Sequence, residues 1–168
     1  MPIATIPIAN YKPFYIQVDG ATTAVDTRTE WGMIIKSNPY IFLPNPKECY
    51  KNDWKDEDGD DEYNAVMHYE AFDLECQFYL KATAGTNTTA AAELQSLLDD
   101  FFDTIKEGEF KIFDTYTMKG FQKVRYAGYE PDEYKARGDW AKQIFRIKFK
   151  VNDPTTRMKM NNGAIVTA

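Results

Sequence analysis

Apolar and polar residues alternate with a period of two in two segments of the chain. The first segment covers residues 72–81 and the second covers residues 145–151. Because successive side chains of a strand point to opposite faces, this pattern predicts two strands, each with one buried and one solvated face, as in antiparallel sheets. Shorter apolar runs predict four further strands, at residues 31–36, 40–43, 110–113 and 121–129.

One helix is expected between these strands. Apolar residues recur along one helical stripe at Leu94, Leu97, Leu98, Phe101 and Ile105. Thr88 or Thr89 can cap the first turn, and Gly108 offers a left-handed stop after the last. We therefore expect a helix over about residues 89–107.

The order of these elements predicts the fold class. Strands come first, then one helix, then more strands, so the regular alternation of a parallel doubly wound sheet is excluded. We expect a mainly β (α+β) fold: an antiparallel β-sandwich or partly closed barrel with one flanking helix. The whole chain, residues 1–168, is expected to form one domain. Three segments fit poorly into its core: an N-terminal arm (about 1–30), a long acidic loop (about 44–64) and a C-terminal tail (about 155–168).

The composition contains few of the residues that usually carry out catalysis. The chain contains one histidine, His68, two cysteines and two serines, and it lacks the glycine-rich loops that bind nucleotides. We therefore expect no enzyme, no cofactor and no metal site; Cys76, within an alternating run, is expected to be a small buried hydrophobe. No apolar run is long enough to span a membrane, and no secretory signal is expected.

Charge is divided along the chain. Residues 53–62 carry seven acids and one lysine, whereas residues 119–160 carry eleven bases and five acids. Opposite charges in separate blocks favour contacts between copies of the chain, although the two blocks could equally pair within one subunit. The candidate contact residues are Trp54, Asp56, Asp58, Asp60 and Asp61 in the acidic loop, and Arg146 and Lys148 on the last long strand. Weak binding of a cation by the loop stays open, although the acids do not follow the spacing of a calcium-binding loop.

Several phrases occur together in a recognisable order. Trp31-Gly32 comes first, followed by the acidic loop 51–63, the strand 71–82, the capped helix, the phrase GEFKIFD at 108–114 and the phrase FKVNDP at 149–154. Over roughly residues 30–155 the chain resembles tail proteins of long-tailed bacteriophages and prophages of Bacteroides-type bacteria. It is most similar to the ring-forming domain of distal tail proteins and to tail-tube subunits.

The resemblance implies a structural protein of the virion tail, made in the bacterial host cytoplasm. Its expected partners are further copies of itself, in a ring that is a hexamer in this family, and adjacent tail proteins. Genome DNA would pass through the channel without specific binding, and no membrane would be involved. Loops and arms would clasp neighbouring subunits; alternatively, the acidic loop would line the channel.

Two interpretations from other classes remain. A small carbohydrate-binding β-sandwich would use Trp31, Trp54, Trp140 and the many tyrosines as stacking platforms, in which case exposed aromatic side chains should share one concave face. A cytosolic enzyme of another type has no positive support in the sequence.

Overall fold

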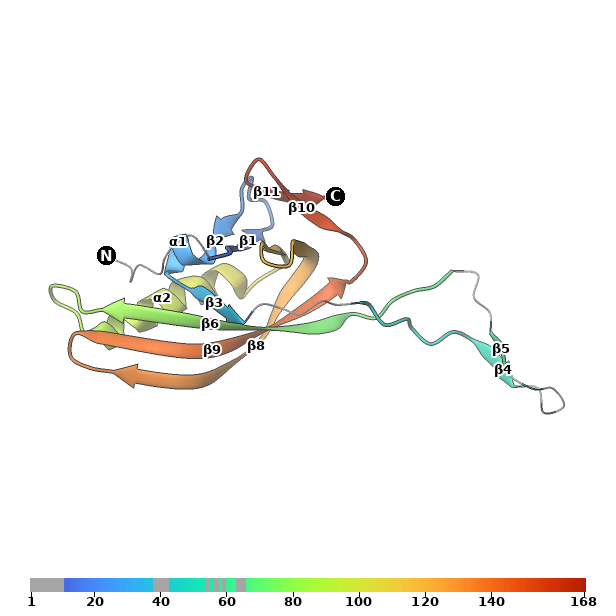
Figure 1. Ribbon diagram of the computed structural model, residues 1–168, viewed down its shortest axis with the longest axis horizontal. Helices are drawn as coiled ribbons and strands as arrows, with labels where there is room; N and C mark the ends of the chain where they lie inside the picture. Colours follow the sequence, from blue (N-terminus) through green and yellow to red (C-terminus); the bar gives the residue numbers. More distant parts are fainter. Residues whose placement is uncertain (1–10, 38–42, 54, 56–57, 59, 63–65) are drawn as a thin grey trace.

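The computed structural model describes residues 11–37, 43–53, 55, 58, 60–62 and 66–168. Its main feature is a seven-stranded sheet in the order β2-β1-β7-β8-β9-β6-β3, in which every neighbouring pair is antiparallel. Two two-stranded sheets, β4-β5 and β10-β11, lie outside it (Figure 1). The elements are β1 (Phe14–Val18), β2 (Val25–Asp26), α1 (Thr27–Trp31), β3 (Ile34–Ser37), β4 (Lys51–Asp53), β5 (Asp60–Glu62), β6 (Phe72–Thr83), α2 (Ala90–Ile105), β7 (Phe110–Asp114), β8 (Lys119–Ala136), β9 (Trp140–Asp153), β10 (Met158–Asn161) and β11 (Ala164–Thr167).

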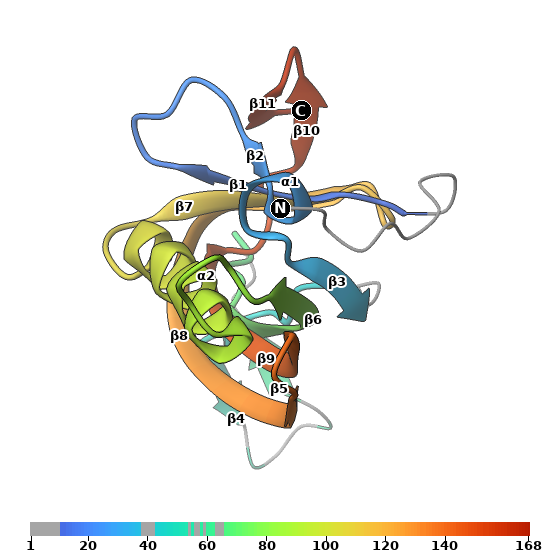
Figure 2. The same cartoon turned by 90° about the vertical axis from the view of Figure 1, so that its left-hand side faces the viewer.

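The large sheet curls without closing. Seen along the molecule, it turns from β1 and β7 through β8 and β9 to β6 and β3, and α2 lies within the curve (Figure 2). The helix packs against β6, β9 and β8. This arrangement confirms the expected antiparallel, mainly β fold with one long flanking helix, and it is an open sheet rather than a closed barrel.

The predicted core is confirmed. The inward side chains of β6 and β9 are buried, from Leu74 to Leu80 and from Phe145 to Val151. The register of the two strands places Cys76 opposite Ile147 and Phe78 opposite Phe145. From α2, Leu94, Phe101 and Ile105 are buried above them, whereas Leu97, Leu98 and Phe72 are only partly buried at the margin of the cluster.

Helix α2 begins as its sequence indicates, and it ends at Ile105 with Lys106, in the right-handed helical conformation, as its C-cap. The Thr89 hydroxyl accepts a hydrogen bond from the Ala92 amide at 3.2 Å, which satisfies one of the unpaired amides of the first turn. The Thr88 hydroxyl donates to the Glu93 carboxylate. Gly108, with φ of 74°, follows shortly after the helix and takes the left-handed conformation that favours glycine.

The N-terminal segment is more ordered than an arm. Strand β1 pairs with β7 over five residues, and β2 covers its other edge. The expected strand at 31–36 is wrong in its first half, because Trp31 ends the short helix α1. The Asp26 carboxylate caps α1 by accepting from the Arg28 amide at 3.0 Å, and Gly32, with φ of 69°, ends it. Asp followed by Gly six residues later is a helix signal that the apolar pattern obscured.

The C-terminal segment is a docked hairpin, not an extended tail. Asn162 and Gly163 both have positive φ and connect β10 to β11 as a tight turn. Met158 and Ile165 pack on Phe113 of β7 in a small second core. The Ile165 amide donates to the buried Gln17 side chain at 2.6 Å, which ties the hairpin to β1. The Asn-Gly pair therefore marks a turn rather than a loose end.

Asp153 closes β9 with a set of hydrogen bonds. Its carboxylate accepts hydrogen bonds from the Gln122 side-chain amide at 2.6 Å, from the Thr156 backbone amide at 3.1 Å and from the Thr156 hydroxyl at 2.7 Å. Burial alone would raise the pKa of this carboxyl, but the hydrogen bonds outweigh burial and lower the pKa to about 2. The turn that leads to β10 therefore depends on an ionised Asp153.

We expect this ionisation to contribute to acid stability. The folded pKa of Asp153 lies below its ordinary value of 3.8, so its stabilisation is present above about pH 4 and is lost as the pH falls toward 2. After allowing for solvent screening, the loss should be about 1 kcal/mol. Urea unfolding of the wild type and of Asp153→Asn between pH 2 and pH 6 measures it. The difference in free energy of unfolding between the two proteins should disappear at low pH. A difference that does not change with pH would contradict the stabilising role of the ionised carboxylate.

Candidate functional site

An arm projects from one end of the sheet. The chain leaves after β3 and returns before β6, and the β4-β5 hairpin lies far from the sheet (Figure 1). The two legs pair near the base, where the Lys47 amide donates to the His68 carbonyl at 2.8 Å and the Glu70 amide donates to the Asn45 carbonyl at 2.9 Å. The acidic loop of the sequence is thus a two-stranded ribbon.

Large apolar side chains of the arm are exposed to solvent. Leu43 is 82% exposed and Tyr50 is 75% exposed, and Val66 and Met67 are exposed as well. An isolated two-stranded ribbon is only marginally stable in water. Exposed apolar side chains on such a ribbon are typical of a surface that is covered by another molecule.

The predicted acidic contact residues belong to this arm. Asp60 and Asp61 lie in β5, opposite Asp53 and Asn52 of β4. Asp58 is exposed at the tip between the strands, while Trp54 and Asp56 lie outside the described residues. The structure therefore places Asp58, Asp60 and Asp61 on the projecting hairpin, and their role in subunit contacts stays a prediction.

Arg146 is already paired within its own chain. Its guanidinium contacts Asp132 at 2.8 Å, Glu75 at 3.1 Å and Glu130 at 3.3 Å. The hydrogen bonds that Arg146 donates to the Asp132 and Glu75 carboxylates raise the pKa of its guanidinium. Lys148 also lies 3.9 Å from Glu130. Arg146 and Lys148 are thus part of an internal charge network on the outer face of β6, β8 and β9, so the structure weighs against them as the partners of a neighbour's arm.

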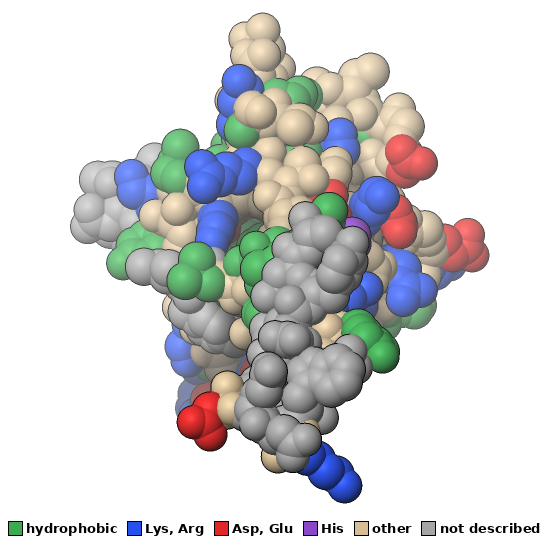
Figure 3. Space-filling model, turned by 90° about the vertical axis from the view of Figure 1, so that its right-hand side faces the viewer, with side chains coloured by type: hydrophobic (Ala, Val, Ile, Leu, Met, Phe, Trp, Pro, Cys, Tyr) green, Lys and Arg blue, Asp and Glu red, His purple; other side chains and the backbone are tan. Residues whose placement is uncertain are grey.

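The charge blocks are therefore partly interleaved, because acidic β6 lies beside basic β9 in the sheet. Near the start of β8, basic side chains have fewer carboxylates beside them. Arg125 of β8 stands directly across from Lys150 of β9, and Lys150 has Asp73 at 3.5 Å. Neither Arg125 nor the exposed Lys123 forms an ion pair with any residue that the structure describes. From the end that carries the arm, Lys and Arg side chains are more evident than Asp and Glu (Figure 3).

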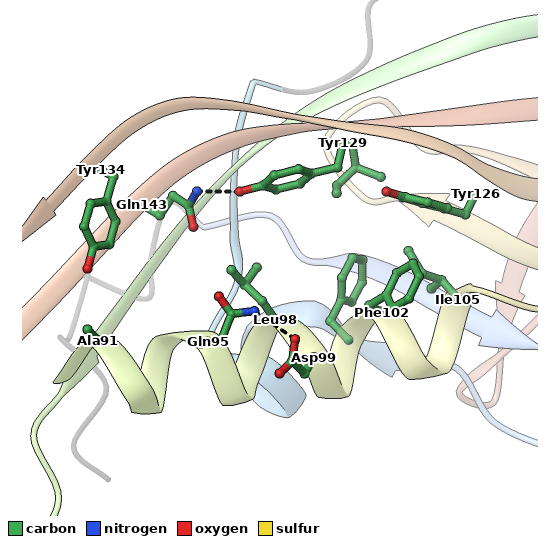
Figure 4. A pocket seen from close by; sticks show the side chains of 12 residues that line it. Ala91, Gln95, Leu98, Asp99, Phe102, Ile105, Tyr126, Tyr129, Tyr134 and Gln143 are labelled. Carbon is green, nitrogen blue, oxygen red and sulfur yellow. Dashed lines mark hydrogen bonds between the residues drawn. The ribbon is translucent and has the colours of Figure 1, made fainter. Parts of the chain in front are cut away.

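A second surface is a groove between α2 and the outer half of β8 and β9 (Figure 4). Its volume is about 570 Å³. Beyond the part paired with β7, β8 pairs with β9 and with no other strand that the structure describes, and the helix does not fill the space beneath it. The walls carry Leu98 and Phe102 from the helix, and Tyr126, Tyr129 and Tyr134 from β8.

Two β-bulges bring the three tyrosines to one face. In a regular strand, residues 126 and 129 would point to opposite faces because the side-chain period is two. The register shifts between Tyr126 and Gly128 and again between Pro131 and Glu133. As a result all three tyrosines stand opposite inward residues of β9: Phe149, Ile147 and Gln143. Period-two analysis of the sequence misses this alignment, although Pro131 signals a strand edge.

The groove combines aromatic rings with neutral polar groups. Gln143 donates a hydrogen bond to the Tyr129 hydroxyl, and Gln95 donates to Asp99 at 2.8 Å (Figure 4). Burial raises the pKa of Tyr126 and of Tyr129, so both phenols stay protonated at neutral pH. The lining residues include Asp99 and no lysine, arginine or histidine.

Trp31 and Trp140, the two tryptophans that the structure describes, do not form the expected stacking surface. Trp31 is buried in the core, with its ring 5.1 Å from that of Phe101. Trp140 lies beneath the Lys81 ammonium and the Arg137 guanidinium, which approach its ring to 5.7 and 5.9 Å. Trp54 lies outside the described residues. A carbohydrate-binding module was expected to expose aromatic side chains on one concave face. The tyrosines of the groove meet this expectation, whereas Trp31 is buried.

Residues typical of catalytic or metal sites are scattered. Cys76 is fully buried, as expected, and burial raises the pKa of its thiol. Cys49 is a free cysteine on the arm. Within the described ranges, no group of three or more His, Cys, Asp or Glu side chains could hold a metal ion, and no helix is long and apolar enough to cross a membrane.

Comparison with known proteins identifies a fold relative. No protein-family model matches the chain, and no curated protein matches its sequence. Among solved structures, the chain is similar to the SPP1 Dit protein (gp 19.1), described as a paradigm of the hub adsorption apparatus of phages that infect Gram-positive bacteria, with a TM-score of 0.53 and 14% sequence identity. The match covers 88% of this chain and 52% of that one, so this chain spans about half the length of its fold relative. The two chains thus share a fold.

Proposed function

We propose that this protein is a structural, non-enzymatic component of a bacteriophage tail, either a distal tail protein or a tail-tube protein. In this proposal copies of the chain form a ring of six subunits, as the family resemblance implies, around the channel through which DNA passes. The shared fold with a tail hub protein supports a tail role. The observation that carries the proposal furthest is the projecting arm.

The arm supports assembly because it cannot bury its apolar side chains within its own chain. Leu43, before the paired base of the arm, and Tyr50, directly before β4, are both exposed. A closed ring is built from heterologous contacts, in which one surface of a subunit meets a different surface of the next. An arm that reaches over a neighbour provides such a contact, and its apolar residues supply the burial on which affinity depends.

The charge of the arm supplies register in this proposal. The sequence indicated Arg146 and Lys148 as cationic partners, but both have carboxylates of their own chain beside them. Lys123 and Arg125 are better candidates because they are exposed and have no such partner among the residues that the structure describes. Complementary charge across a contact sets orientation and association rate more than affinity.

Neutralising the arm should weaken assembly. We expect the variant Asp56→Asn, Asp58→Asn, Asp60→Asn, Asp61→Asn to form fewer rings than the wild type and to show a smaller salt dependence, because screened ion pairs would be missing. The reciprocal variant Lys123→Gln, Arg125→Gln should behave in the same way. Sedimentation velocity across a salt series, with electron microscopy of the same samples, measures both effects.

A matched control neutralises four exposed acids elsewhere, in and after α2: Asp100, Asp103, Glu107 and Glu109. This variant should assemble as the wild type does. Intact rings with unchanged salt dependence in the arm variant would remove the contact role and favour an arm that lines the channel. A wild-type protein that stays monomeric at every salt and protein concentration would contradict the ring itself.

A further inference from the structure

We propose that the groove between α2 and β8 binds a neutral glycan chain. The lining supplies both kinds of contact that a sugar needs. A pyranose ring has apolar faces of C–H groups and a rim of hydroxyls, so it is bound by aromatic rings combined with a few fixed polar groups. Tyr129 is 41% exposed, Phe102 45% and Tyr134 54%, so their rings are accessible to a ligand.

The polar groups of the groove can both donate and accept. The Tyr129 hydroxyl accepts from Gln143, so its own proton remains available to a ligand. Gln95 and Asp99 lie on the opposite wall, where Asp99 keeps acceptor capacity beyond its bond to Gln95. Sugar hydroxyls, which donate and accept, match this set.

The charge of the groove selects against anionic ligands. Asp99 is the charged residue in the lining, and acidic Asp100 and Asp103 follow on the same helix. Lysine and arginine are missing from the lining, so a phosphate-containing polymer or an acidic polysaccharide would meet repulsion without compensation. A ligand without negative charge is the complementary one.

The tyrosines form a row rather than a cage. Tyr134, Tyr129 and Tyr126 follow one another along β8, above the length of α2 (Figure 4). A row of rings along an open groove suits a chain of repeated units, each of which can lie on one ring. The two bulges that create the row are therefore recognition features in this proposal.

The free edge of β8 argues against an added peptide strand as the occupant. Pro131 lies in this edge and lacks an amide hydrogen, and two bulges interrupt the ladder that an added strand would need. Charged Glu130 and Asp132 also lie along it. Such features protect an edge from pairing, whereas a sugar needs side chains and not a regular backbone edge.

The test measures binding to the full chain by isothermal titration calorimetry, with cellohexaose, maltohexaose and tetra-N-acetylchitotetraose as probes. We expect at least one to bind with a Kd of about 1 mM or tighter. Tyr129→Ala and Tyr134→Ala should each raise that Kd by about tenfold, because each removes a stacking ring. Tyr134→Phe keeps the ring and should retain most of the affinity.

Tyr116→Ala is the matched control, because Tyr116 is an exposed tyrosine outside the groove and its loss should leave the Kd unchanged. Circular dichroism of each variant verifies folding. The proposal is overturned if no probe binds at concentrations up to about 10 mM, or if the groove variants bind as the wild type does. It is also overturned if Tyr134→Ala abolishes self-association instead, which would assign the groove to a second copy. Glycan binding by a protein that forms no rings would refute only the ring proposal.

Discussion

Phe101→Ala should lower the free energy of unfolding by about 3–5 kcal/mol. Phe101 is 2% exposed, and its ring packs edge-on against Trp31 at 5.1 Å and lies 6.5 Å from that of Phe78. It therefore joins α2 both to α1 and to the floor of the sheet. Truncation leaves a cavity between α1 and the sheet. The rings of Trp31 and Phe78 belong to different elements and cannot both move in to fill it.

The adjacent residue provides the control. Phe102 has the same side chain on the same helix, but it is 45% exposed and contacts Tyr126 at the groove. Phe102→Ala should cost about 1 kcal/mol or less, since only the aromatic contact and partial burial are lost. Urea unfolding of both variants by circular dichroism compares them. Equal losses would show that α2 does not bury the face that the structure assigns to it.

The second large effect is expected at Gly120, near the start of β8. A Cβ atom at this position would lie 2.7 Å from the Ile112 carbonyl oxygen, 2.7 Å from the Phe113 ring and 3.0 Å from the Met158 Cβ. The Ile112 carbonyl oxygen belongs to the backbone of β7, so it cannot move without displacing the strand. We expect Gly120→Ala to cost about 3 kcal/mol through overpacking.

This substitution should also loosen the C-terminal hairpin, because Met158 and Phe113 form the small core under β10 and β11. Hydrogen exchange of the Ile165 amide, which bonds to Gln17, reports the loosening directly. Gly128→Ala is the matched control in the same strand, where the nearest atoms to a new Cβ would be those of Lys148 at 3.9 Å. Little change is expected there, and a similar loss at both glycines would refute the close approach at Gly120.

The two surfaces of the protein occupy different parts of the fold. The arm lies between the end of β3 and the start of β6. The groove lies along α2 and the far half of the β8-β9 hairpin (Figure 1). The sheet between them is held by the fully buried rings of Phe14, Phe78, Phe145 and Phe149. If both proposals hold, substitutions in the arm and in the groove should act separately on assembly and on glycan binding, since distant sites usually contribute additively.

Elements whose signal is local were predictable from the order of the amino acids. The alternation in β6 and β9 and the stripe of α2 identified their buried faces, because burial on one side of a strand or helix requires a regular period. The N-terminal cap of α2 was narrowed to Thr88 or Thr89 for the same reason, since capping depends on neighbouring backbone groups. The projecting acidic segment was also recognised from its composition, although its ribbon pairing was not.

Features that depend on residues distant in the sequence become visible only in the folded chain. The partners of Arg146 come from positions 75, 130 and 132, so the division of charge along the chain did not predict the network in space. Trp31 became a core residue because α1 places it against Phe101. The aromatic groove requires two register shifts in β8, and a register is set by pairing with β9 and not by the local pattern. Local periods specify which side of each element is buried, whereas the pairing of distant strands decides which surface residues meet.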